Sequence, residues 1–560
     1  MADGPAFTTC DADSQVIDKL RSAERDRIPQ VPGPAASDAA ATARWFQGVP
    51  LIHTIGNSIV PYIYGRCAFA DMADALGTAT DSRHRIYMIG WWTDPSTRLK
   101  DGPGQLLRDY LSSTKAAIRG MFWDDPGGTS IFGPQQKVAD NGPIVALLNG
   151  LPNGAAILDH KLPFFRFGGQ QTGVRGGVHH QKLLVVSGSS GLIAFTGGMD
   201  INPSRVLVSA GGFEPLHDVH VRVIGPESAK VLNVFRERWL DHEDSPKLDL
   251  AKFNMAAFEV SQDFDAVAKG RSDSTFPTST RKLGSKNDAF HAVAIGRTYA
   301  KLRKFNSGTN KESYSFAPNG EETAWRLIQN AIQRSSTFIY IEDQYLVSRR
   351  LKAELVTKLR DPKFQFVLIL MQDSGTFEKN KDNFFDNEIP YLIAARNEIR
   401  TDFLSVDPKR TKWRMFRLKA SADPKRQQFC GSYVHSKTLI FDDDFAVTGT
   451  ANAGDRGYSY DTEVVAGVTD DPFGRATAQR FARNLRVNLW HKHLAVSQNS
   501  LIDWKSALRF WFNPPSQAMI VDSSDLEDSP MLGGKAILRD FSQANRLWQE
   551  DIDPDADLLP

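Results

Sequence analysis

One sequence pattern occurs twice in this chain and limits the folds that the chain can adopt. Each copy begins with an apolar stretch of helical spacing that leads into a short apolar run of strand length: Ala68–Leu76 into Arg85–Trp92, and Trp325–Gln333 into Thr337–Tyr345. A further strand follows in each copy, at Ile118–Trp123 and at Phe364–Met371. Helices that alternate with buried strands predict an α/β fold whose mixed sheets are flanked by helices on both faces. The recurrence predicts two similar halves, the product of an ancient duplication.

The length of 560 residues fits two such halves. We expect five segments, which are a partly mobile lead-in, a first half, a linker or surface loop, a second half and a tail. Their bounds are 1–45, 46–265, 266–290, 291–520 and 521–560. A cluster of Ser, Thr, Lys and Gly residues with little periodicity indicates the linker. An acidic composition with several Pro and Gly residues indicates the tail.

Composition excludes several classes of protein. The 67 basic and 66 acidic residues nearly cancel, so the basic excess typical of a nucleic-acid binder is missing and we expect no nucleic-acid partner. Three scattered cysteines predict neither a disulfide framework nor a zinc site. The N-terminus lacks the basic start and apolar run of a secretory signal, and no segment approaches the ~20 apolar residues of a membrane span. We therefore expect a soluble monomer that is cytoplasmic or exported by a signal-independent system.

Two histidine–lysine motifs carry the chemistry. The first lies in Val178–Ser187 and the second in Val434–Asp442, and a glycine-containing turn follows each. The candidate residues are His180, Lys182, Gly197, Gly198 and Asp200 in the first copy, and His435, Lys437, Gly449, Thr450 and Asn452 in the second. Alternate side chains of a strand share a face, so each histidine is expected to point the same way as its lysine. An imidazole can attack or protonate a phosphate ester, while an ammonium compensates its oxyanions.

Two such motifs supply what a double displacement at phosphorus needs. One imidazole attacks while the other protonates the leaving alcohol, and the roles then reverse as water or another alcohol enters. An unperturbed histidine pKa near 6.5 makes both roles accessible. The glycine turns are expected to let backbone and small polar groups approach the substrate. The scheme requires no metal or other cofactor, and stimulation by calcium stays open.

Each attacking or protonating histidine needs an acceptor on its other ring nitrogen. Asp218, in the first copy, and Asp461 with Glu463, in the second, lie downstream at corresponding places. Both segments have strand character. We therefore predict that each half supplies the carboxylate for its own histidine.

These motifs resemble those of the phospholipase D superfamily. His435–Asp442 matches the complete HxKxxxxD signature, and Gly449–Asn452 is similar to the Gly-Ser-x-Asn turn that follows it. The first copy resembles eukaryotic-type phospholipases D through its His, Lys and Gly-Gly-x-Asp, and so does His217–Pro226. The likeness spans roughly residues 50–490, in the right order, and the chain looks like compact microbial members, some of which are delivered into other cells as toxins.

The resemblance implies a fold and an activity. Two α/β halves would pack side by side, with the active site in the cleft between them. The implied reaction is hydrolysis of a glycerophospholipid at a membrane surface to phosphatidic acid and free headgroup, with transphosphatidylation. It also implies that His180 forms the covalent phosphohistidine and that His435 is the general acid.

One motif position departs from the family signature. Ser187 stands where the first motif would carry its aspartate, the counterpart of Asp442. By strand alternation this position faces away from the histidine and lysine, so its role is expected to be structural. Loss of the carboxylate would then cost on the order of 1 kcal/mol of buried hydrogen bonding, and the chemistry would survive.

Other interpretations remain open. A nuclease of the same superfamily is disfavoured by the charge balance, and a catalytically inactive scaffold or lipid-binding protein is suggested only by Ser187. His179 is expected on the opposite face from His180. The aromatic residues Trp91, Trp92 and Trp511 are expected to serve packing. The basic residues of 409–426 form either a solvated face or a dock for anionic headgroups.

Overall fold

The computed structural model of the protein describes most of both halves. The described residues are 42–124, 129–130, 133–134, 139–159, 178–206, 216–269, 291–301, 304–305, 311–373, 388–419, 433–471 and 480–527. Residues 1–41 of the predicted lead-in, 270–290 of the linker, 420–426 of the basic segment and 528–560 of the tail lie outside them.

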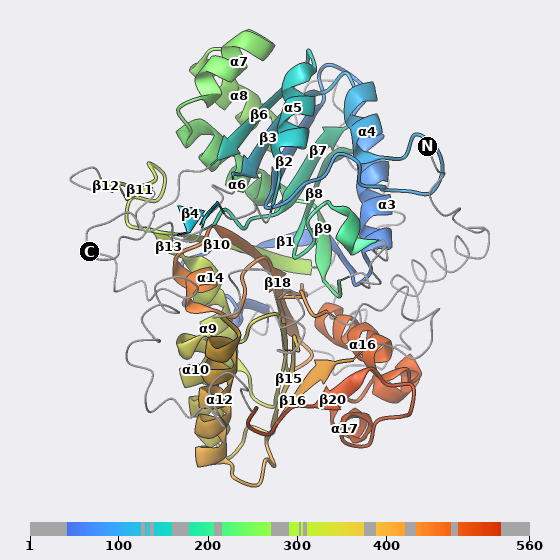
Figure 1. The fold of residues 1–560 in the computed structure, drawn as a ribbon, viewed down its shortest axis with the longest axis vertical. Helices are drawn as coiled ribbons and strands as arrows, with labels where there is room; N and C mark the ends of the chain where they lie inside the picture. Colours follow the sequence, from blue (N-terminus) through green and yellow to red (C-terminus); the bar gives the residue numbers. More distant parts are fainter. Residues whose placement is uncertain are drawn as a thin grey trace.

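One mixed sheet runs through both halves of the molecule (Figure 1). The strands of the first half, in spatial order, are β6 (Gly154–Asp159), β3 (Ala117–Trp123), β2 (Arg85–Gly90), β7 (Leu183–Gly188), β8 (Gly191–Gly197), β9 (His220–Ile224) and β1 (Thr54–Tyr62). The order continues through the second half with β10 (His291–Tyr299), β19 (Glu463–Asp470), β18 (Phe445–Gly449), β17 (Thr438–Phe441), β14 (Phe338–Asp343), β15 (Phe366–Met371), β16 (Trp413–Leu418) and β20 (Ile520–Asp522).

Apart from β20, which has no counterpart in the first half, equivalent strands follow in the same order from each edge of the sheet toward its middle. In each half the first strand along the chain lies at the centre, and β1 pairs antiparallel with β10 there. The strands β2 and β3 are parallel neighbours, as are β14 and β15. An antiparallel central pair with equivalent strands on either side relates the halves by an approximate two-fold rotation. The predicted α/β fold with two similar halves is confirmed.

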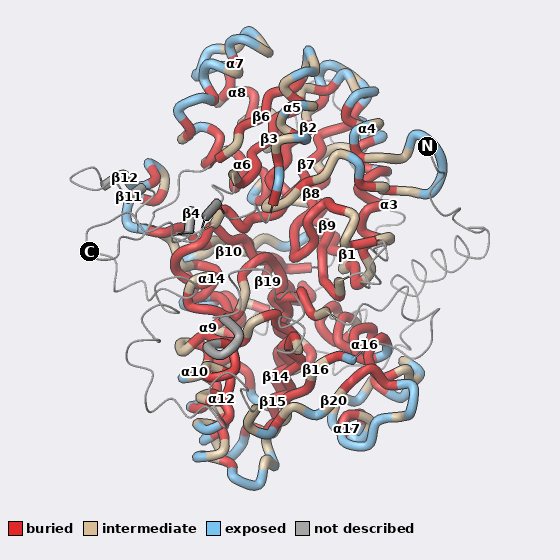
Figure 2. Tube along the Cα trace, in the orientation of Figure 1, coloured by how far each residue is buried: buried red, intermediate tan, exposed pale blue. Residues whose placement is uncertain are grey.

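Helices cover both faces of the sheet, as alternating side chains require. In β2, Ile86 and Met88 pack in one core while Tyr87 and Ile89 pack in another. The first-half helices are α3 (Gly65–Leu76), α4 (Leu107–Ser113) and α5 (Gly142–Gly150) on one face, and α6 (Ser228–Asp241), α7 (Ser245–Phe253) and α8 (Ala257–Ala268) on the other. The second-half helices are α9 (Thr323–Arg334), α10 (Arg349–Arg360) and α12 (Glu388–Val406), opposite α16 (Phe481–Leu494) and α17 (Trp504–Phe512). Figure 2 shows the strands largely buried, while the outer helices carry both buried and exposed residues.

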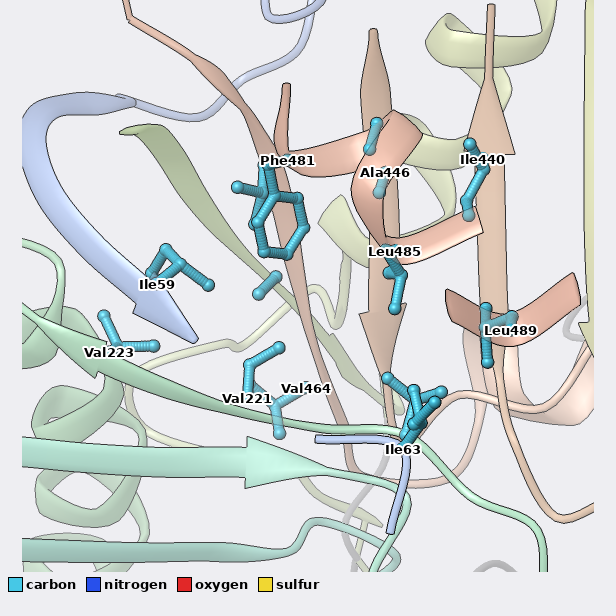
Figure 3. Close-up of a cluster of buried hydrophobic side chains, with 14 of the residues drawn as sticks. Ile59, Ile63, Val221, Val223, Ile440, Ala446, Val464, Phe481, Leu485 and Leu489 are labelled. Atoms are coloured by element: carbon cyan, nitrogen blue, oxygen red, sulfur yellow. The ribbon is translucent and has the colours of Figure 1, made fainter. Parts of the chain in front are cut away.

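A single hydrophobic core joins the two halves. Ile59 of β1 and Val221 of β9 come from the first half, and Val464 of β19 and Leu485 of α16 from the second. Figure 3 shows these side chains gathered in one cluster at the junction. Burial of apolar side chains from both halves fixes their relative placement, since each contributes about 1.5–3 kcal/mol on transfer from water. A site built across this junction is therefore held by packing rather than by a flexible hinge.

The chain enters the fold through the second half. Trp45 is fully buried, stacks on Phe445 with ring centroids 5.2 Å apart, and donates from Nε1 to Asp444 at 2.8 Å. Phe46 and Val49, which the sequence places with the first half, pack in this same second-half core. The next strand, β1, then belongs to the first half, so the entering segment ties the two halves together.

The predicted helices and strands of the repeated pattern are present with small differences in length. The Ala68 and Trp325 stretches are α3 and α9, and the four apolar runs are β2, β3, β14 and β15. Helix α8 continues to Ala268, three residues into the predicted linker. Among the described helices, none combines the length and the apolar character that a membrane crossing needs.

Candidate active site

The two histidine–lysine motifs precede strands β7 and β17 rather than lying in them. The strands begin at Leu183 and Thr438, so the prediction of longer strands was wrong. The reason is that the motif backbones pair with the other half. The amide of His180 donates to the carbonyl of Thr462 at 3.1 Å, and the amide of His435 donates to the carbonyl of His217 at 2.8 Å. These short parallel bridges bring each motif to the start of the other half's strand, β19 or β9.

Each histidine is held by a carboxylate of the opposite half. His180 Nδ1 lies 2.9 and 3.1 Å from the two carboxylate oxygens of Glu463, and His435 Nδ1 lies 2.7 Å from Asp218 Oδ2. The prediction that each half serves its own histidine was therefore wrong. The crossed bridges explain the exchange, because Glu463 directly follows Thr462 and Asp218 directly follows His217.

Burial sets the protonation of these pairs. It lowers the pKa of both His180 and His435 well below the ordinary value, and the neighbouring lysine charges lower them further. Burial also raises the pKa of Asp218 to about 6 and that of Glu463 to about 7. A neutral imidazole that donates its Nδ1 proton to a carboxylate keeps a lone pair on Nε2. Both rings are thus prepared to use Nε2 on a substrate.

The two lysines lie buried beside the histidines, each 2% exposed. Lys182 Nζ donates to the carbonyl of His180 at 2.9 Å, and Lys437 Nζ donates to Gln344 Oε1 at 3.1 Å and to the carbonyl of His435. Both ammonium groups act on the pKa of both histidines. The fold therefore brings the four motif side chains into one electrostatic environment that suits an anionic phosphate.

The glycine turns make room for the carboxylate-bearing strands. A Cβ on Gly198 would lie 2.0 Å from Asp218 Oδ1, and one on Gly449 would lie 2.3 Å from the carbonyl of Val464. Gly197 has φ +147°, and a Cβ there would lie 2.6 Å from the Cα of His220. These glycines thus allow the turns to lie close to the neighbouring segments that carry Asp218, His220 and Val464. We had expected them to allow a close approach of the substrate.

The polar residues of the turns have separate tasks. Asp200 accepts the amides of Trp91 and Trp92 at 3.1 and 3.0 Å and lies 3.5 Å from Lys182 Nζ. Thr450 Oγ1 donates to Glu463 and so orients that carboxylate. Asn452 Oδ1 is buried without a hydrogen-bond partner among the described residues, which makes this amide a candidate substrate contact.

Asp461 supports the first motif without touching the ring of His180. Its Oδ1 accepts the amide of Val178 at 2.6 Å, and its Oδ2 accepts from Arg456 Nε at 2.7 Å. These bonds hold the backbone two residues before His180. Of the three predicted carboxylates, the structure therefore places two against the histidines and one behind them.

The eighth motif positions lie at the far ends of their strands. Asp442 accepts hydrogen bonds from the amides of Ser336, Thr337 and Phe338 at 2.8–2.9 Å. It therefore fixes the backbone where β14 begins. Ser187 pairs with Arg85 of β2, five residues beyond Lys182, which corresponds to roughly 16 Å along a strand. Neither side chain is close to a histidine of its own motif.

A buried network behind His435 was missed from the sequence. Glu342 accepts from His217 Nε2 at 2.8 Å, from His493 Nε2 at 2.8 Å and from the Tyr340 hydroxyl at 2.7 Å, while Lys492 Nζ lies 2.9 Å from His217 Nδ1. Among the described residues, His217, Glu342 and His493 form the one trio whose ligand atoms lie close enough for a metal ion, within 4.8 Å. Glu342 accepts three hydrogen bonds and Lys492 holds the other ring nitrogen of His217, so these residues form a connected hydrogen-bonded network. Its members come from three distant segments, which no sequence spacing reveals.

The aromatic residues divide between packing and the site. Trp511 is 1% exposed and packs against Tyr340, Phe416 and Trp490, as predicted. Trp91 and Trp92 also pack as predicted, against the cluster of Trp123, and Trp91 stacks on that ring with centroids 5.6 Å apart. Trp91 is half-buried, and its ring also meets that of His180 edge-on at 6.2 Å. His179 contacts Asp159 at 3.1 Å and Thr462 at 3.1 Å, away from the His180–Glu463 pair.

The described part of the basic segment pairs with groups of the protein itself. Arg410 contacts Asp525 at 2.5 Å, and Arg417 pairs with Asp373. Lys412 Nζ donates to the carbonyl of Asp361 at 2.6 Å, just beyond α10. Over residues 409–419 these contacts favour the interpretation as a structural, solvated face.

Comparison with known proteins shows which family the chain resembles. Residues 328–485 match the family model described as "Cardiolipin synthase, PLD-like domain". The chain is 23% identical over 573 residues to phospholipase D alpha 1 of Cynara cardunculus, a match that covers 81% of this chain and 66% of that protein. It is 22% identical over 574 residues to phospholipase D alpha 2 of Oryza sativa subsp. japonica, with 80% and 65% covered. The chain is similar in sequence to members of the phospholipase D superfamily along most of its length.

The matches span just under two thirds of the length of the two plant relatives. Among solved structures, the phosphatidylserine synthase of Haemophilus influenzae Rd KW20 aligns with a TM-score of 0.48 and 13% identity, over 79% of this chain and 91% of that one.

Proposed function

We propose that this protein is a phospholipase D. It would hydrolyse the distal phosphodiester of a glycerophospholipid to phosphatidic acid and free headgroup, and transfer the phosphatidyl group to added alcohols. The observation that supports this most is the crossed arrangement of two neutral imidazoles, each with its Nδ1 on a buried carboxylate. The names of the plant relatives favour a phospholipid substrate over other diesters.

The proposed reaction has two displacements. Nε2 of His180 attacks phosphorus and forms an N–P bond, while the P–O bond to the headgroup breaks and that oxygen takes a proton from His435. Water or an alcohol then loses its proton to His435 and attacks phosphorus, and the N–P bond breaks. Lys182 and Lys437 offset the charge on the phosphoryl oxygens in both steps.

His435 must carry a proton in the first step, although burial and nearby cations lower its pKa in the free site. A bound phosphate brings negative charge against these cations, which raises the pKa of the ring as substrate arrives. His435 therefore carries its proton once the substrate is bound. All steps use side chains of this chain, so we expect turnover to persist in EDTA.

The test is an assay with vesicles of mixed phospholipids in the presence of ethanol. We expect phosphatidylethanol from the wild-type protein and none from His180→Ala or His435→Ala. His491→Ala is the matched control, because His491 is exposed on α16 and bonds only to the Val496 carbonyl in the described contacts. Cleavage of plasmid in parallel, without phosphatidylethanol, would favour a nuclease. A phosphoryl adduct trapped on His435 would reverse the assigned roles.

A further inference from the structure

Arg205 is a buried cation beside the site whose guanidinium is only partly satisfied. It ends a single 3-10 turn, Pro203–Arg205, five residues after Asp200, and is 3% exposed. Its Nη2 lies 3.4 Å from Asp200 Oδ2, and its Nη1 lies 3.8 Å from Asp218 Oδ2, beyond hydrogen-bond distance. Within the described residues, neither Nη1 nor Nε of Arg205 has a hydrogen-bond partner.

Two other arginines are matched more completely, and the buried Arg119, Arg222 and Arg238 each leave one nitrogen without a hydrogen-bond partner in the described structure, where Arg205 leaves two. Arg486 donates through Nε and Nη2 to the carboxylate of Asp443 at 2.5 and 2.7 Å, and also to two carbonyls. Arg456, which follows the second turn as Arg205 follows the first, bonds to Asp461 at 2.7 Å. Leaving buried charged donors unpaired is costly, so a purely structural role does not account for Arg205.

The two turns also differ in charge. Asp200 stands where the second half has the neutral Asn452. A carboxylate at this place would repel an anionic phosphate, and Arg205 offsets that charge. Its influence reaches groups of both halves, because it lowers the pKa of His435 as well as that of Lys182.

We propose that Arg205 donates from its unpaired Nη1 to a non-bridging oxygen of the substrate phosphate, as a third cation beside Lys182 and Lys437. The edge of the planar guanidinium that Nη1 shares with Nη2 suits two parallel hydrogen bonds to phosphate oxygens, which a lysine in its place cannot make, and the present contact of Nη2 with Asp200 is long at 3.4 Å. The inference rests on the phosphodiesterase site of the proposed function, but not on the lipid nature of the substrate.

Tungstate binding, followed by tryptophan fluorescence or calorimetry, tests the role without a lipid. We expect Arg205→Gln to raise the Kd for tungstate about tenfold to a hundredfold, as loss of hydrogen bonds between charged groups does, and Arg205→Lys to raise it less. Arg222→Gln is the matched control. Arg222 is likewise buried, has an Nε without a partner in the described structure, and pairs with Asp71. We expect this control to lose stability but to keep its Kd.

The outcomes separate the two proposals. If wild-type protein binds tungstate and both Arg205 variants keep its Kd, the role of Arg205 is overturned while the phosphodiesterase site stands. If the wild-type protein binds no tungstate, both proposals fail. Should Arg205→Gln not fold, the Kd of Arg205→Lys decides, because that variant keeps the charge. KM for bis(p-nitrophenyl) phosphate should rise in parallel with Kd, whereas an arginine that only stabilises the fold would lower the melting temperature and leave KM unchanged.

Discussion

Replacing Asp218 with asparagine tests whether Asp218 orients His435 for catalysis or only stabilises the fold. The side chain keeps its shape, which matters because a Cβ on Gly198 would already meet Asp218 Oδ1 at 2.0 Å. Asparagine can still accept the Val219 amide, which donates to Asp218 Oδ1 at 2.9 Å. It can no longer hold the Nδ1 proton of His435 with a full charge. Its amide instead favours the tautomer with the proton on Nε2.

The expected loss of activity is large. In the triad of serine proteases the same replacement lowers kcat about 10⁴-fold, because the histidine adopts the wrong tautomer. We expect a loss of about 10³- to 10⁴-fold in kcat for a soluble diester, with the larger part in the step that needs His435. A single charge-assisted hydrogen bond would account for only about 10- to 150-fold, or about 1.5–3 kcal/mol.

The free energy of unfolding of Asp218→Asn at pH 8 should not fall along with the activity. Burial raises the pKa of Asp218 to about 6, whereas an unfolded aspartate has a value near 3.9. A carboxyl with a raised folded pKa destabilises the protein increasingly as pH rises from the unfolded value through the folded one. At pH 8 this cost is on the order of 3 kcal/mol. Its removal offsets the lost bond to His435, so at pH 8 the variant should be at least as stable as the wild type.

The assay combines urea unfolding at pH 5 and 8 with kcat for bis(p-nitrophenyl) phosphate. Asp249→Asn is the control, because Asp249 is buried and pairs with Arg119 at 2.8 Å at the interface of α7 with the sheet. It should lose stability and keep its kcat. An Asp218→Asn variant that keeps kcat within tenfold, or that loses activity only in proportion to a loss of folded protein, would refute the reasoning.

Three further predictions concern residues outside the site. Asp442→Ala should lower the free energy of unfolding by about 2–4 kcal/mol, since three amides at the entrance to β14 lose their acceptor, and the folded fraction should keep its kcat; a large fall in kcat would contradict the structural role. Ser187→Asp, which completes the family signature, should leave kcat within about twofold, and a strong rise would argue for a role in the site. Glu227 is buried, and burial raises its pKa to about 7. The free energy of unfolding should therefore fall between pH 5 and pH 8, and it should fall more for the wild type than for Glu227→Gln. Equal pH slopes of the two proteins in urea titrations would contradict this.

The sequence predicts the parts of this site that local spacing determines. His180 and Lys182, like His435 and Lys437, are two residues apart, and an extended backbone brings such side chains to one face whether or not it forms a regular strand. The repeated order of helices and strands likewise predicts two halves, because each apolar run must be buried between covering helices.

What the sequence does not predict depends on contacts between distant segments. The exchange of Asp218 and Glu463 between halves follows from the antiparallel pairing of β1 with β10 and from the bridges at His217 and Thr462, which periodicity does not encode. Arg205 ends a short 3-10 turn that no periodic pattern marks, and only the fold brings it near Asp218.

A structure of the protein with bound tungstate tests the central claim most directly. The account predicts one anion at the junction of the halves, in contact with Nε2 of both His180 and His435 while Glu463 and Asp218 hold the opposite ring nitrogens. Two anions in separate sites, or an anion that reaches only one of the two rings, would contradict it.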